Sequence, residues 1–230
     1  MALWNPRDYD SWYLTPLGRV SDAIEKSHIL ALAGVMPGEK AFDAGCGTGI
    51  YTIELAKRGA YTAGFDNSLD MLLSAKAKAE KEGLTINFLA ADATGLPFKD
   101  GSFDIALSVG MLCFIADMDG ALLEMKRVLR PGGRIVIGVL NKWSPWALLR
   151  RIKGLFKETV YDRARNVSPP QLKRALITAG FDAVEIRTCL FFLPVNSSLY
   201  LKLAKFCEIP AGFLSPYTGA FIAASAKKPM

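Results

Sequence analysis

The stretch Ala41–Ile50, AFDAGCGTGI, decides how this sequence folds. A short apolar run leads directly into glycines that alternate with other residues, and Asp43 precedes them. This pattern predicts a strand that ends in a tight turn, where glycine permits both the turn and the close approach of a ligand. Glycine turns at strand ends bind several kinds of ligand, so the neighbouring residues have to identify this one.

The residues after the turn exclude two phosphate-binding motifs. A Walker-type phosphate loop needs Gly-Lys-Ser/Thr, which does not follow here. The dinucleotide pattern G-x-G-x-x-G fits Gly45 and Gly47, but Ile50 stands where the third glycine belongs. The remaining pattern is Asp-x-Gly-x-Gly-x-Gly, from Asp43 to Gly49. A turn that needs glycine for backbone reasons alone stays open as the alternative.

Composition sets wide limits on function. The chain has 230 residues, 51% of them hydrophobic, which is enough for one substantial core, so we expect a single domain over 1–230. The net charge of +6 fits an ordinary solvated surface, nucleic acid or anionic lipid. Four scattered cysteines and a single histidine predict free thiols and no metal site. No signal peptide or membrane-length apolar run is visible, and we expect a cytoplasmic protein.

Short apolar runs alternate with helical periods between residues 40 and 140. Leu72, Ala75 and Ala79 show helical spacing in one such period. The alternation predicts parallel strands joined by right-handed crossovers, hence a doubly wound α/β sheet with helices on both faces. A helix at 169–179 and two further strands follow. The expected buried strands of the first part are KAFDAG, AYTAGF, TINFLA, FDIALS and GRIVIGVL.

Three segments lie outside this alternation. Residues 1–38 form an N-terminal helical segment, expected as a lid, ahead of the cofactor-binding core at 39–140. Residues 141–167 and 194–217 are expected insertions over one edge of the sheet, near the substrate side. We find no internal repeat and no low-complexity linker.

Three acids are predicted at the carboxyl ends of successive strands. Asp43 suits a cationic group better than a pyrophosphate, because like charges repel at short range. Asp66 follows about 20 residues after the glycines, where an acid accepts hydrogen bonds from ribose hydroxyls. Asp92 follows the third strand and can accept from an adenine amino group, although taken alone it fits a helix N-cap. Together they predict a nucleoside ligand with a cationic tail.

In the order FDAGCGTG, GFDNSLDML, AADATGLPFKDGSFDIALS and LLEMKRVLRPGGRIVIGVL, these motifs resemble the class I S-adenosylmethionine-dependent methyltransferases of methyltransferase type 11. The subgroup includes the ubiquinone/menaquinone-type C-methyltransferases. The resemblance covers about residues 39–140. It implies a seven-stranded, Rossmann-like, mostly parallel sheet with an antiparallel last strand. It also implies S-adenosyl-L-methionine as cofactor and S-adenosyl-L-homocysteine as product.

The resemblance also implies cofactor contacts at individual positions. The backbone of the glycine turn would contact the methionyl part, Asp66 the ribose, and Asp92 the adenine. Tyr13 belongs to an aromatic segment that resembles a lid, with packing on the sheet as the alternative. Met71 would flank the adenosine, with a place in the core as the alternative, because methionine on a helix is commonly core. The implied cofactor-binding residues are Tyr13, Asp43, Gly45, Cys46, Gly47, Thr48, Asp66, Asn67, Met71, Asp92, Ala93 and Ser108.

No catalytic residue is predicted. His28 falls in a helical stretch before the first strand, where a structural role is expected. Relatives often carry a histidine after the fourth strand, but Cys113 and Phe114 stand in that region here. Tyr13, or an acceptor with an acidic proton, would fill the gap.

The acceptor is the least determined part of the function. The segment 141–157 interleaves aromatic and basic residues, which fits a membrane surface, a nucleic-acid patch, or a helix over the active site. Nucleic-acid motifs after the fourth strand are missing, since Ser108 and Val109 stand there, so we expect a small, hydrophobic acceptor and no nucleic acid. The alternatives are an RNA or protein methyltransferase, and a non-catalytic scaffold of the same fold.

Overall fold

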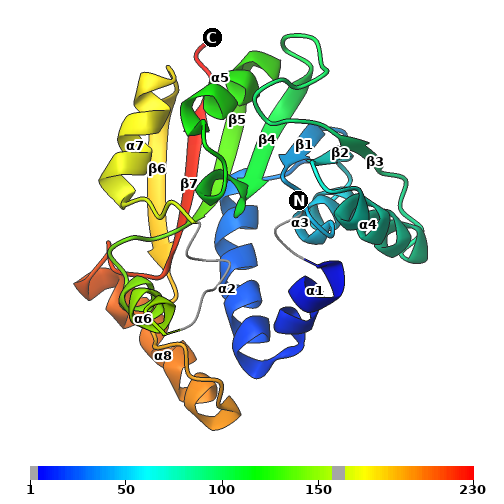
Figure 1. The fold of residues 1–230 in the computed structure, drawn as a ribbon. Helices are drawn as coiled ribbons and strands as arrows, with labels where there is room; N and C mark the ends of the chain where they lie inside the picture. The colour runs from blue at the N-terminus through cyan, green and yellow to red at the C-terminus, as the bar shows by residue number, and fades with distance from the viewer. Residues whose placement is uncertain (1–4, 157–163) are drawn as a thin grey trace.

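A seven-stranded sheet forms the centre of the protein (Figure 1). We describe it from a computed structural model covering residues 5–156 and 164–230. The strand order is β3-β2-β1-β4-β5-β7-β6; β7 runs antiparallel to both neighbours, and the other neighbouring pairs are parallel. The expected sheet with an antiparallel last strand is confirmed. The strands are β1 Lys40–Ala44, β2 Tyr61–Asp66, β3 Asn87–Ala90, β4 Phe103–Val109, β5 Leu129–Leu140, β6 Asp182–Cys189 and β7 Phe221–Lys227.

Helices cover both faces of the sheet (Figure 1). Four of them begin with a capping side chain followed by proline, a pair that satisfies a backbone N–H and presets the first helical φ. These pairs start at Asn5, Thr15, Ser144 and Ser168. The helices are α1 Pro6–Leu14, α2 Pro16–Ala33, α3 Ile50–Lys57, α4 Leu69–Lys81, the short 3₁₀ helix η1 Met111–Cys113, α5 Met118–Val128, α6 Pro145–Gly154, α7 Pro169–Thr178 and α8 Ser198–Leu214.

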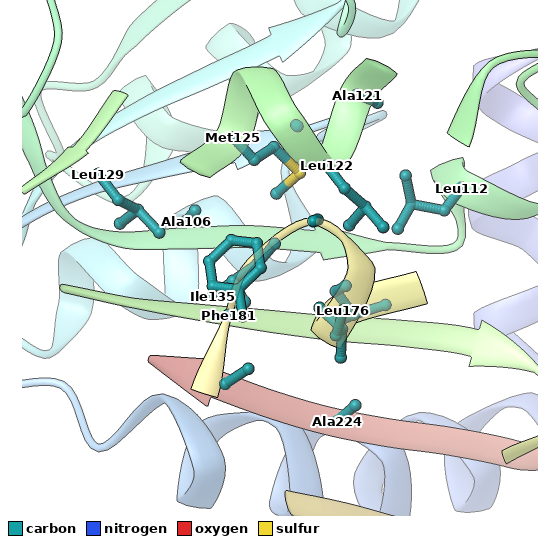
Figure 2. Packing of buried hydrophobic residues seen from close by; sticks show 14 of the residues in the cluster. Ala106, Leu112, Ala121, Leu122, Met125, Leu129, Ile135, Leu176, Phe181 and Ala224 are labelled. Carbon is teal, nitrogen blue, oxygen red and sulfur yellow. The ribbon is translucent and has the colours of Figure 1, made fainter. Parts of the chain in front are cut away.

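Side chains of the central strands alternate between two cores. In β4, Ile105 packs in a core with side chains of α2 and α3, whereas Ala106 packs in the opposite core with α5 and α7. Figure 2 shows this opposite core, with Leu122 of α5 and Leu176 of α7 lying over the strands. Because both faces are buried, central strands need apolar residues at nearly every position, which gives the continuous apolar runs of the sequence.

The strand β3 differs from its expectation. The run TINFLA was expected to be buried, but in β3 Asn87, Leu89 and Ala90 are exposed and Phe88 is half-buried. The strand lies at one edge of the sheet and, among the described residues, pairs only with β2. Apolar composition predicted the strand but not its place in the sheet order, which pairing decides.

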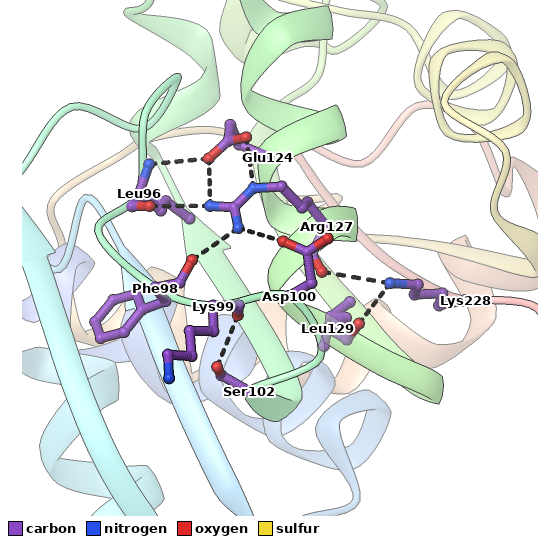
Figure 3. A network of polar contacts seen from close by, with 9 residues as sticks. All are labelled: Leu96, Phe98, Lys99, Asp100, Ser102, Glu124, Arg127, Leu129 and Lys228. Atoms are coloured by element: carbon purple, nitrogen blue, oxygen red, sulfur yellow. Dashed lines mark hydrogen bonds and ion pairs between the residues drawn. The ribbon is translucent and has the colours of Figure 1, made fainter.

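A polar network fixes the loop after β3 (Figure 3). The Arg127 guanidinium of α5 donates to the carbonyls of Leu96 and Phe98 at 2.9 and 2.7 Å. It also binds the carboxylates of Glu124 and Asp100, and Glu124 accepts a hydrogen bond from the Leu96 backbone N–H. The planar guanidinium meets several acceptors at fixed angles, so the loop is held in one position against α5.

The two expected insertions form helices next to the β6 edge. The Trp146 indole of α6 packs edge-on against Phe192, with ring centroids 6.0 Å apart, and donates a hydrogen bond to the Phe192 carbonyl. On α8, the Glu208 carboxylate accepts from the backbone N–H groups of Leu190 and Phe191. The segment after β6 therefore joins α6 and α8. Residues 157–163, which belong to the first insertion, lie outside the described residues.

Candidate active site

The carboxyl ends of the parallel strands meet at one edge of the sheet. The register places Asp66 of β2 beside Ala90 of β3. Because β7 is antiparallel, its first residue, Phe221, comes to the same edge and pairs with Leu140 at the end of β5. A cavity of about 670 Å³ lies at this edge, lined by residues from α1, α2, α6 and the strand ends. Ligands of doubly wound sheets bind at this edge, so the cavity is the candidate active site.

We divide the cavity into two sides. The turn side lies over β1, β2 and β3 and is lined by Gly45, Gly47, Asp66, Asn67, Met71, Asp92 and Ala93. The cap side lies over β4, β5 and β7 and is lined by Glu25, Tyr51, Leu140, Trp146, Arg150 and Phe221. The two sides meet where the neighbouring strands β1 and β4 end.

The glycine turn of the turn side adopts a conformation that favours glycine. Gly45 and Gly47 have φ values of 72° and 53°, in the left-handed region. A Cβ on Gly45 would lie 2.3 Å from the Met111 Cβ, whereas a Cβ on Gly47 would meet nothing within 4 Å. Gly45 is therefore required by packing. Gly47 leaves open space at the cavity, as expected for a turn that a ligand approaches closely.

Asp66 holds the turn side together. One carboxylate oxygen accepts a hydrogen bond from the Gly47 N–H at 2.9 Å, and the other accepts from the Ser68 N–H at 2.9 Å. Each oxygen keeps a further lone pair for another donor. The side chain is half-buried and lines the cavity. This geometry suits the ribose contact predicted for Asp66.

Asp92 lies at the far end of the turn side. Its Oδ1 accepts from the Thr94 N–H at 2.8 Å and from the Thr94 hydroxyl at 2.6 Å, and these bonds lower the pKa of Asp92. No helix begins here, so the N-cap alternative is wrong; Asp92 closes a short turn instead. Its second oxygen is available to a ligand. Ala93 and the buried Met71 line the same region.

Four predicted contact residues do not line the cavity: Asp43, Cys46, Thr48 and Ser108. Asp43 is 2% exposed and accepts from the Thr52 hydroxyl at 2.7 Å; burial raises its pKa to about 7. The Cys46 thiol lies beneath the turn, and burial raises its pKa. Ser108 is fully buried, and its neighbours Val109 and Gly110 face the cavity instead. Asp43 of β1 and Ser108 of β4 lie away from the cavity because successive side chains of a strand point to opposite faces.

Thr48 connects the glycine turn to α1. Thr48 lies two residues before helix α3, which begins at Ile50. Its hydroxyl donates to Asp10 of α1 at 2.7 Å, and Asp10 also pairs with Lys78 of α4 at 2.7 Å. These two contacts fasten α1 to the glycine turn and to α4.

Helix α1 contributes one wall of the cavity. Tyr9, Trp12 and Tyr13 line it. The Tyr13 hydroxyl donates to the Tyr9 hydroxyl at 2.9 Å. The Trp12 ring packs edge-on against the Tyr13 ring, with ring centroids 4.9 Å apart. Burial raises the pKa of Tyr13, so the phenol stays neutral. The aromatic wall limits access of water to the cavity.

The cap side contains polar groups that sequence reasoning missed. Glu25 of α2 and Tyr51 of α3 line it, together with Arg150 of α6, whose guanidinium lies 5.6 Å from the Trp146 ring centroid. Burial raises the pKa of Glu25 to about 8, partly offset by Arg150. No sequence signal connects these positions, since they are far apart and follow no motif. His28, also on α2, does not line the cavity.

Comparisons with known proteins identify the family. A family model for a methyltransferase domain matches residues 42–137. An uncharacterized protein of Mycobacterium tuberculosis is 31% identical over 206 residues, which is 89% of this chain and 67% of that protein. A demethylmenaquinone methyltransferase of Beutenbergia cavernae is 37% identical over 139 residues, 60% of this chain and 55% of that enzyme. The chain spans about half the length of several curated relatives that it matches.

Comparison with solved structures also identifies a methyltransferase. A Thermotoga maritima protein described as "SAM-dependent methyltransferase, possible histamine N-methyltransferase" aligns with a TM-score of 0.73 and 28% identity. The alignment covers 96% of this chain and 95% of that one. The chain belongs to the class I S-adenosylmethionine-dependent methyltransferases, and the cofactor of this family is S-adenosylmethionine.

The cavity fits this cofactor. Gly47 and Gly110 both line the cavity with positive φ values and open space where a Cβ would lie, so bare backbone faces the ligand. Asp66 and Asp92 keep carboxylate lone pairs that would accept hydrogen bonds from ribose and adenine donors. Within the described residues, no three His, Cys, Asp or Glu side chains gather as a metal site would require. Residues 5–156 and 164–230 contain no helix that is long and apolar enough to cross a membrane.

Proposed function

We propose that this protein transfers a methyl group from S-adenosylmethionine to a small, mainly apolar acceptor by direct displacement. The observation that carries the proposal is one cavity with two unlike sides. The turn side carries backbone and carboxylates for the cofactor. The cap side adds Leu140, Trp146 and Phe221, which offer apolar surface to a second molecule beside the cofactor.

The main task of the protein in this mechanism is to align the acceptor with the cofactor. The cofactor supplies an activated methyl group, and the protein must bring the acceptor atom to near-contact distance in line with the breaking bond. Asp66 and the glycine turn orient the cofactor. The wall of Trp12 and Tyr13 excludes water, and the cap side sets the acceptor's position.

The acceptor chemistry is supported by one relative's name. The Beutenbergia protein is named for demethylmenaquinone, a lipophilic quinone. We therefore expect a lipophilic ring compound in preference to RNA or protein, the alternative acceptors. The T. maritima name points to an amine instead. A scaffold without turnover is disfavoured because the cap side forms a second binding space that a scaffold does not need.

The surface of α6 supports contact with a lipid membrane. The face opposite the buried Trp146 exposes Leu148 and Ile152, at 61% and 45%, with Arg151 exposed beside them. Apolar residues flanked by cations bind an anionic lipid surface. Since Trp146 and Arg150 of the same helix line the cavity, a lipophilic acceptor would enter next to the membrane.

Calorimetric titration with S-adenosylmethionine, S-adenosylhomocysteine and NAD tests the cofactor first. We expect micromolar binding of the first two and none of NAD. A tritium-transfer assay then offers quinols, phenols, amines, RNA and protein as acceptors. Binding without transfer to any acceptor would support the scaffold alternative, and salt-sensitive transfer to RNA would contradict a small acceptor.

A further inference from the structure

The carboxylate of Glu25 has an unusual environment on the cap side. It lines the cavity, and within the described parts of the chain it forms no hydrogen bond or ion pair. The nearby cation Lys26 is paired instead with Asp22, at 2.8 Å. Structural carboxylates removed from bulk water are almost always bonded to a donor. One that faces a cavity without a partner is available to a ligand.

The tyrosines around Glu25 do not compete with it as bases. Tyr51 is 7% exposed, lines the cavity, and its hydroxyl has no hydrogen-bond partner within the described residues. Burial, followed by the Glu25 carboxylate, raises the pKa of Tyr51 well above its usual value, and burial does the same for Tyr13. Both phenols stay protonated near neutral pH. They can orient an acceptor but cannot take its proton.

The charges around the cavity favour an acceptor hydroxyl over a protonated amine. The guanidinium of Arg150 lines the cap side, and the cofactor brings a positive sulfonium. Two cations disfavour an ammonium between them, whereas they stabilise the negative charge that develops when a hydroxyl loses its proton.

We propose that Glu25 is a catalytic residue, the general base that accepts the proton of an aromatic hydroxyl on the acceptor while that oxygen is methylated. The assignment rests on the proposed methyl transfer. It places the proton acceptor on α2, in a segment where sequence motifs give no base.

The step balances as follows. A lone pair of the acceptor oxygen forms a bond to the methyl carbon, and the carbon–sulfur bond breaks with its electron pair going to sulfur. The O–H proton passes to the Glu25 carboxylate. The sulfonium charge and the carboxylate charge disappear together, leaving a neutral ether, a neutral thioether and a carboxylic acid, which returns its proton to solvent after product release.

The pH dependence of this base follows from all its charged neighbours. Burial and Asp22 raise the pKa of Glu25, and Arg150 and Lys26 lower it, which gives about 8. The base is active when deprotonated, so the rate rises with pH and levels off above about pH 8. The titratable and charged groups that interact with Glu25 are Asp22 and Lys26 on α2, Tyr13 on α1, Tyr51 on α3, Cys189 on β6 and Arg150 on α6.

The experiment compares wild type with Glu25→Gln, using exposed Glu80→Gln on α4 as the matched control. The probes are 1-naphthol, its methyl ether and 1-naphthylamine, titrated into the S-adenosylhomocysteine complex and assayed for tritium transfer. We expect wild type to prefer naphthol over its ether by about tenfold, and Glu25→Gln to lose that preference. Where naphthol is methylated, Glu25→Gln should lower the rate about 10²- to 10⁴-fold and remove the plateau near pH 8.

Three outcomes overturn the proposal: unchanged preference and rate in Glu25→Gln, no binding of naphthol to wild type, or Glu25-dependent selection of the amine. Calorimetry with S-adenosylmethionine separates these from a failure of the proposed function. If wild type binds no cofactor, methyl transfer itself is wrong; if Glu25→Gln binds cofactor normally, a loss of rate belongs to the acceptor side.

Discussion

The two sides of the cavity are built in different ways. The turn side is made by consecutive motifs at strand ends, and Asp66 bonds the Gly47 backbone directly. The cap side is made by side chains of separate helices, Glu25 from α2, Tyr51 from α3 and Arg150 from α6. All members of the family bind the same cofactor, which requires a fixed backbone arrangement. The turn side is therefore specified by short motifs, each local in the sequence. Acceptor recognition depends on side chains that only tertiary packing brings together.

The largest expected effect concerns Asp43, the buried acid beneath the turn side. Burial raises its pKa from a usual value near 4 to about 7, so the folded state holds a proton that the unfolded chain releases. The stability that depends on this proton is fully present below about pH 4. Wild type loses it as the pH rises from about 4 to about 7, because over this range the unfolded chain releases the proton and the folded chain keeps it. Asp43→Asn should therefore gain stability relative to wild type between pH 4 and 7, by at most about 4 kcal/mol.

Urea unfolding at pH 5, 6, 7 and 8 measures this difference. Other titrating groups cancel because both proteins carry them. A difference between variant and wild type that stays constant with pH would mean that Asp43 is ionised beneath the turn throughout.

The second largest effect is expected for Asp66→Ala, which should weaken cofactor binding on the turn side. The change removes the acceptor of the Gly47 and Ser68 N–H groups together with the expected ribose contact. We expect S-adenosylhomocysteine to bind about 1–3 kcal/mol more weakly by calorimetry. The exposed Asp70→Ala on α4 is the control. Equal affinity of a folded Asp66→Ala protein would remove Asp66 from the cofactor site.

Asp10→Ala tests how α1 joins the two sides. Asp10 accepts from Thr48 and pairs with Lys78, both at 2.7 Å. Loss of these contacts should loosen α1 by about 1 kcal/mol and speed cofactor release roughly fivefold in stopped-flow measurements. Asp119→Ala on α5 is the matched control. An unchanged release rate would show that α1 does not retain the cofactor.

The smallest effect is expected at the outer face of α6. Leu148→Ser should reduce sedimentation with phosphatidylglycerol-containing vesicles about threefold, because less apolar surface enters the lipid interface. Leu123→Ser on α5, which is 55% exposed, serves as control. Binding that is insensitive to Leu148, or equal on purely zwitterionic vesicles, would contradict the proposed membrane contact.

Sequence pattern predicted most of the sheet and most of the turn side. The central strands are buried on both faces, so their apolar runs were unmistakable. It predicted Gly45, Gly47, Asp66 and Asp92 at the cavity as well. Burial of β3 was wrong, because edge position depends on strand order.

Sequence pattern did not predict which side chains of the motifs line the cavity. Asp43 and Ser108 lie in motifs next to the cofactor-facing residues, but the alternation of strand faces turns them away from the cavity. A motif gives spacing along the chain, whereas the direction of each side chain depends on strand register and on neighbours such as Thr52.

The sequence by itself determined the fold, the family and the edge of the sheet where a cofactor binds. These features follow from local periodicity and from short motifs, in which every residue lies close to the others along the chain. Only the tertiary structure placed Glu25, Tyr51 and Arg150 around one cavity and fastened Asp10 to Thr48. Such contacts join residues separated by many turns of chain, and their positions follow from how α1, α2 and α6 pack on the sheet.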